Sequence, residues 1–67
     1  MLETRLRVAR AERRVTQEEL ARSVGVSRQT ISSIENRSYS PSVKLALAIA
    51  ECLDMDVNDL FQLVQPE

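Results

Sequence analysis

Several residue types are scarce in this sequence. Its 67 residues include no histidine or tryptophan, one cysteine, one glycine, two prolines and only two aromatic residues. Without histidine, a single thiol can build neither a zinc site nor an internal disulfide, and an unpaired cysteine fits a reducing cytoplasm. Because no general base is arranged either, we expect a cytoplasmic protein with no metal, no cofactor and no enzymatic activity.

Long apolar runs are also missing. None approaches the roughly 18 residues of a membrane span, and charges begin at Glu3, which excludes a signal peptide. We therefore expect no membrane association. The low content of glycine and proline favours an all-α fold. The length predicts one domain, residues 1–67, with little stability to spare.

Charge of neither sign dominates the whole chain, but the two halves differ. The net charge is −1, with eight arginines and five glutamates in residues 1–38 and one lysine and five acidic residues in 39–67. The first half could therefore face phosphates, and the second half solvent or a partner. An ordinary mixed surface is the alternative interpretation.

Regular start signals predict five helices. N-cap residues are expected at Thr16 (with Glu19 as a capping box), Ser27, Ser40 (before Pro41) and Asp56. The expected helices span 3–13, 17–24, 28–36, 41–53 and 57–63. The fourth is apolar around most of its circumference, with only Lys44, Ala48 and Glu51 on its open side, so we expect it to be buried centrally. Cys52 lies at the margin of that apolar face and is interpreted as a small apolar residue rather than a nucleophile.

Residues 16–36 predict two short helices joined by a tight turn at Gly25. In the second helix, Ile31 and Ile34 lie opposite a polar face made of Arg28, Gln29, Ser32, Ser33 and Asn36. Arginine and glutamine can each make two hydrogen bonds to a base edge, and no carboxylate interrupts this face. The pattern favours a helix that contacts DNA bases in the major groove over a surface that is merely polar.

The chain resembles the helix-turn-helix domains of the phage lambda and 434 repressor and Cro group, also called the xenobiotic-response-element family. The resemblance rests on T-Q-E-E-L-A-x-x-V-G-V-S-R-Q-T-I-S-x-I-E-N, followed by Y-S-P-S-V-x-L-A-L-x-I-A. It extends from about Arg5 to Phe61 and is close to small stand-alone bacterial and archaeal regulators. It implies a compact five-helix bundle, with a helix-turn-helix at 16–36, that binds double-stranded DNA and regulates transcription, most simply as a repressor.

The resemblance implies separate roles for individual residues. Base contacts are expected from Arg28, Gln29, Ser32 and Ser33. Phosphate contacts are expected from Gln17, Ser27, Asn36, Arg37, Ser38, Tyr39 and Lys44. Gln17 is also expected to brace the first residue of the base-contacting helix, and Arg10 and Glu35 to form a buried ion pair between the first and third helices.

Two positions depart from the family pattern. Positions 14 and 37 are often glycine in the family and are Arg14 and Arg37 here. If the backbone keeps a positive φ at these positions, each arginine is strained by about 1–2 kcal/mol. We expect Arg37 to add a phosphate contact, whereas no role is assigned to Arg14.

A single domain of this kind covers too few base pairs to mark one genomic site. We therefore expect a homodimer on palindromic half-sites one helical turn apart. The expected contact is the C-terminal helix, about 57–64, through Leu60, Phe61, Leu63 and Val64, with Leu60 also serving the core. Packing of these residues on the first and fourth helices is the alternative. A protein-binding module is a second class of function, either an antitoxin that masks a toxin and represses its own operon or an adaptor for a larger regulator.

Overall fold

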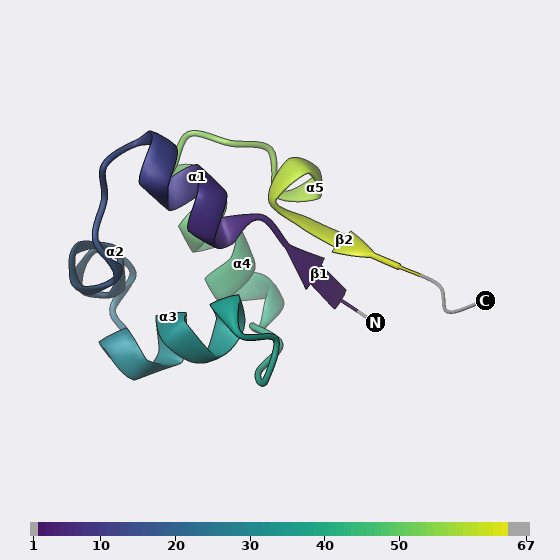
Figure 1. The fold of residues 1–67 in the computed structure, drawn as a ribbon, viewed down its shortest axis with the longest axis horizontal. Helices are drawn as coiled ribbons and strands as arrows, with labels where there is room; N and C mark the ends of the chain where they lie inside the picture. The colour runs from purple at the N-terminus through teal and green to yellow at the C-terminus, as the bar shows by residue number, and fades with distance from the viewer. Residues whose placement is uncertain (1, 65–67) are drawn as a thin grey trace.

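The computed structural model describes residues 2–64, which form five helices and a two-stranded antiparallel ribbon (Figure 1). The elements follow the order β1 (Leu2–Thr4), α1 (Leu6–Glu12), α2 (Gln17–Val24), α3 (Arg28–Glu35), α4 (Val43–Cys52), α5 (Val57–Leu60) and β2 (Phe61–Leu63). The prediction of an all-α five-helix domain is confirmed, and the short ribbon is an addition to it.

The helix starts at Thr16, Ser27 and Asp56 are confirmed. Thr16 Oγ1 accepts from the Glu19 amide at 3.0 Å while Glu19 Oε1 accepts from the Thr16 amide at 2.9 Å, which completes the capping box. Ser27 accepts from the Thr30 amide at 3.2 Å, and Asp56 accepts from the Asn58 amide at 2.8 Å. Local chemistry therefore decides where three of the helices begin.

The predicted start of α4 was wrong. Ser42, rather than Ser40, is the N-cap, since its hydroxyl accepts from the Leu45 amide at 3.1 Å and its backbone is extended. Pro41 consequently lies in the loop, half-buried, instead of in the first helical turn. A serine lies on each side of this proline. The helix that begins after the second serine places Leu45 and Ile49 in the core.

Both ends of the chain also depart from the prediction, for one shared reason. Residues 3 and 4 were expected in the first helix and 61–63 in the fifth, but residues 2–4 and 61–63 pair as antiparallel strands, with Leu2 opposite Leu63 and Thr4 opposite Phe61. α1 begins only at Leu6, whose amide donates to Thr4 Oγ1 at 3.1 Å. A partner almost 60 positions away in sequence supplied backbone hydrogen bonds that local propensity could not anticipate.

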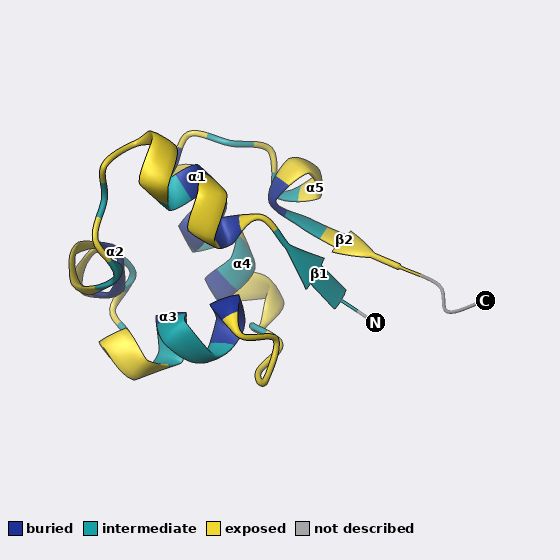
Figure 2. Ribbon diagram, viewed as in Figure 1, coloured by how far each residue is buried: buried dark blue, intermediate teal, exposed yellow. Residues whose placement is uncertain are grey.

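The core lies between all five helices (Figure 2). Its fully buried large side chains are Leu6, Leu20, Ile31, Ile34, Ile49, Leu53 and Leu60. Val15, Val26 and Met55, each just before a helix N-cap, pack against this core as hydrophobic staples predict. Every helix therefore contributes at least one buried residue.

α4 is less buried than its composition predicts. Leu45, Ile49 and Ala50 enter the core, but Val43 and Leu47 are 77% and 52% exposed. Cys52, at the margin of the apolar face, is exposed as well. A domain this small has too few neighbours to cover an apolar helix on every side. Among residues 2–64, no helix combines the length and apolar character needed to cross a membrane.

Candidate nucleic-acid interface

The interface is built on the turn between α2 and α3. Gly25 ends α2 in the left-handed conformation, with φ 78°, as predicted. A β-carbon at this position would meet no atom within 4 Å, so the need for glycine comes from the backbone angle and not from crowding. α3 is then anchored by Ile31 and Ile34, which are 0% and 2% exposed. These anchors hold the opposite face of α3 toward solvent.

That opposite face is accessible, although unevenly. Arg28, Gln29 and Asn36 are exposed, whereas Ser32 and Ser33 are half-buried. The Ser27 hydroxyl caps the helix and also hydrogen-bonds Thr30 Oγ1 at 3.0 Å. The long donors therefore reach furthest from the surface at the N-terminal turn of α3, and the serines present short hydroxyls one turn later.

The loop after α3 closes around this face at Tyr39. The Ser38 amide and hydroxyl both donate to the Ser33 carbonyl, at 3.0 and 3.2 Å, which folds the loop back on the helix. A shallow hollow of about 250 Å³ is lined by Ser27, Gln29, Thr30, Ser33 and Tyr39. Tyr39, 47% exposed, therefore lies beside the polar side chains of α3.

The two cations predicted in this region point to different places. Lys44 lines a hollow with Gly25 and Tyr39, next to the turn between α2 and α3. Arg37, with φ 65°, instead pairs with Glu3 of β1: Nη1 donates to Oε1 at 3.1 Å and Nη2 lies 3.0 Å from Oε2. The structure places Lys44 beside Tyr39 and the turn between α2 and α3, and ties Arg37 to the ribbon.

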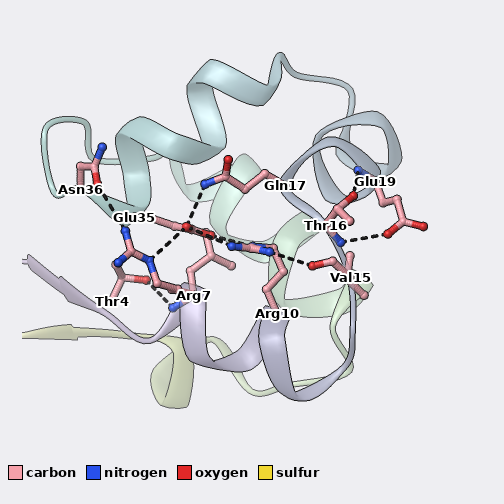
Figure 3. Close-up of polar contacts among 10 residues, drawn as sticks. Thr4, Arg7, Arg10, Val15, Thr16, Gln17, Glu19, Glu35 and Asn36 are labelled. Atoms are coloured by element: carbon pink, nitrogen blue, oxygen red, sulfur yellow. Dashed lines mark hydrogen bonds and ion pairs between the residues drawn. The ribbon is translucent and has the colours of Figure 1, made fainter.

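Glu35, at the end of α3, is the centre of a polar network (Figure 3). Its carboxylate has no exposed area. Arg10 donates to it through Nε at 2.8 Å and Nη2 at 3.3 Å, and uses Nη1 to reach the Val15 carbonyl at 2.9 Å. The buried ion pair implied by the resemblance is therefore present, and it joins α1 to α3 and to the start of α2.

Gln17 belongs to the same network. Its Nε2 donates to Glu35 Oε1 at 3.0 Å, so it braces the last residue of α3, where the resemblance implies the first. Gln17 and Arg28 nevertheless line one hollow of about 370 Å³ together with Arg10, Thr16 and Glu18. The start of α2 and the start of α3 therefore share a surface.

The network keeps Glu35 ionised. Burial raises the pKa of Glu35, but hydrogen bonds from Arg10 and Gln17 and the positive charges of Arg10 and Arg7 outweigh burial, and the pKa falls below its ordinary value of 4.5. In Glu19, hydrogen bonds from the Thr16 backbone and side chain likewise lower the carboxyl pKa. Both carboxylates therefore hold their partners throughout the neutral range.

Sequence reasoning missed one cation in this network. Arg7 Nε lies 3.6 Å from Glu35 Oε1, and its Nη2 donates to Asn36 Oδ1 at 3.5 Å. Arg7 is three positions before Arg10, so both lie on one face of α1. That spacing is the signal which could have identified it. A second missed contact joins Arg13 Nε to the Leu53 carbonyl at 2.6 Å and ties α1 to the end of α4.

Comparison with known proteins agrees with this geometry. The family described as Helix-turn-helix matches residues 6–60. An HTH-type transcriptional regulator of Methanocaldococcus jannaschii, MJ0272, is 45% identical over 60 residues, which cover 90% of this chain and 91% of the relative. YgzD, an HTH-type transcriptional regulator of Bacillus subtilis, is 39% identical over 62 residues, covering 92% and 94%. The P22 c2 repressor, crystallised with the synthetic operator 9T, superposes with a TM-score of 0.77 at 30% identity, covering 81% and 82%.

Proposed function

This chain belongs to the helix-turn-helix family of DNA-binding transcriptional regulators, and from that membership we propose that it represses transcription by binding a specific double-stranded DNA site. The observation that carries the proposal is the outer face of α3, which holds exposed hydrogen-bonding side chains without a carboxylate, on a helix fixed by buried Ile31 and Ile34. The relative crystallised on an operator is itself a repressor, which supports this direction of regulation.

In this proposal α3 enters the major groove. Arg28 and Gln29 contact base edges from the exposed first turn of α3. Ser32 and Ser33 contact base edges one turn later through their hydroxyl groups. A helix anchored on one side by two isoleucines loses little freedom on binding, which favours specific contacts. The predicted phosphate contacts surround this helix: Gln17, Ser27, Asn36, Arg37, Ser38, Tyr39 and Lys44. For Arg37, the contact requires release from Glu3.

Replacing Arg28 tests the assignment of base contacts. The cognate site is first identified by selecting bound sequences from a random DNA pool. Arg28→Ala should then weaken binding to that site by about 1–3 kcal/mol and relax the preference at one base position. Arg22→Ala, which removes the same charge from the last turn of α2, is the control. An equal loss on cognate and random DNA would reassign Arg28 to the phosphate backbone.

We further propose a homodimer that binds two half-sites about one helical turn apart. Leu63 is 80% exposed and Val64 is 44% exposed, and Phe61 is half-buried at the start of β2. Leu60, which was also expected to contact a second copy, is fully buried in the core and cannot do so. The exposed apolar side chains at the end of this ribbon favour its burial against a second copy. Leu63→Lys should shift the protein to monomer in analytical ultracentrifugation and weaken binding to the palindrome more than to one half-site.

A further inference from the structure

The charges around Glu35 do not balance. Two guanidinium groups, Arg7 and Arg10, approach one buried carboxylate. Arg10 is the closer, with two hydrogen bonds at 2.8 and 3.3 Å, and its side chain is only 17% exposed. Arg7 lies at 3.6 Å, beyond hydrogen-bond distance, and is 68% exposed. Arg10 therefore neutralises Glu35, and Arg7 contributes the excess positive charge at the surface.

Two neighbours position the guanidinium of Arg7 but do not use all of its N–H groups. Its Nε faces Glu35, and its Nη2 makes a long hydrogen bond of 3.5 Å to Asn36 Oδ1. Within residues 2–64, its Nη1 has no partner. Because the Asn36 oxygen accepts from Arg7, the Asn36 amide nitrogen is left to donate elsewhere (Figure 3). A guanidinium and an amide NH₂ thus lie side by side as donors at the junction of α1 and α3.

Such a pair of donors suits a phosphate diester. A guanidinium offers charge and a planar set of N–H groups that match phosphate oxygens, and an adjacent amide adds a second direction of hydrogen bonding. The same carboxylate that orients Arg7 also accepts from Gln17 at the start of α2. Glu35 therefore positions Gln17 and Arg7 by direct contact, and Asn36 through Arg7.

We propose that Arg7 binds a backbone phosphate of the DNA, with Asn36 as its co-donor and Glu35 as the group that positions it. This inference rests on the proposed function and adds helix α1 to the interface. It assigns Arg7 a non-specific contact that contributes charge and register, rather than recognition of a base.

A salt titration of DNA binding distinguishes this role from a structural one. Binding of the wild type, Arg7→Gln and Arg7→Lys is measured by fluorescence anisotropy on the selected site and on a random duplex. Arg7→Gln should reduce the slope of log K against log salt by about 0.9, because one fewer counterion is released. The loss should be equal on both duplexes, and Arg7→Lys should restore the slope because it keeps the charge.

Arg5→Gln is the matched control. It removes the same charge from a position two residues earlier, where the side chain lines a hollow with Met55, Asp59 and Gln62 on α5 and its flanks. Its slope should equal that of the wild type, and both glutamine variants should unfold in urea at similar midpoints. A slope for Arg7→Gln equal to that of Arg5→Gln, or no restoration by lysine, overturns the inference while the proposed function stands. If the wild type binds neither duplex, both proposals fall.

Discussion

Removing Arg10 tests how much of the fold depends on the buried ion pair. In Arg10→Met, Glu35 stays buried with Gln17 at 3.0 Å and Arg7 at 3.6 Å as its remaining partners. Loss of one partner of a buried pair costs about 3–5 kcal/mol, and the two remaining contacts favour the lower value. For 67 residues the whole stability is about 3–10 kcal/mol, so the variant should lose between about a third of it and all of it.

Urea unfolding followed by circular dichroism measures this loss. With a slope near 1 kcal/mol per molar for so small a protein, a loss of about 3 kcal/mol lowers the midpoint by about 3 M. Arg22→Met is the control, because Arg22 pairs with Glu18 at 3.7 Å and is 77% exposed. An exposed pair of this kind contributes less than about 1 kcal/mol, so the control should unfold almost like the wild type.

The pH dependence gives a second, independent result. In the wild type the pKa of Glu35 lies below 4.5, so its stabilisation is present above that pH and is lost as the pH falls through the lowered pKa. In Arg10→Met, the hydrogen bonds and charge of Arg10 no longer offset burial, so the pKa of Glu35 should rise. Protonation of Glu35 then removes the unpaired buried charge and reduces the destabilisation of the variant. The difference between the two proteins should therefore shrink between pH 7 and pH 4. A difference below about 1 kcal/mol, or one that is independent of pH, would refute this account.

Two further predictions concern the unusual arginines. Glu3→Gln should free Arg37 from its ion pair and steepen the salt dependence of DNA binding by up to about 0.9, as measured by anisotropy, and an unchanged slope would take Arg37 out of the interface. Arg14, with φ 56°, occupies a conformation that costs a side-chain-bearing residue about 1–2 kcal/mol, partly offset by the greater unfolded-state entropy of glycine. Arg14→Gly should therefore raise the midpoint of thermal unfolding by a few degrees, and a lower midpoint would show that the arginine side chain stabilises the turn.

Much of the candidate interface was predictable because its chemistry is local. The capping box at Thr16 and Glu19, the cap at Ser27 and the left-handed turn at Gly25 each involve residues no more than four positions apart. The periodic isoleucines of α3 then determine which face points outward. The resemblance raised a positive φ at positions 14 and 37 as a condition, and both arginines have it, whereas the third such residue, Asp54 with φ 55°, was not anticipated.

Contacts between distant residues were decided only by the tertiary structure. The ribbon of 2–4 with 61–63, the Glu3–Arg37 pair and the approach of Arg7 to Glu35 join residues separated by 28 or more positions. Each depends on where packing of the five helices places the chain, which neither propensity nor spacing encodes. Sequence alone determined that five helices form and which face of α3 points outward, since short-range hydrogen bonds and hydrophobic period suffice for these. Folding decided which charges are neutralised and which stay available, because that balance depends on burial and on neighbours from other elements.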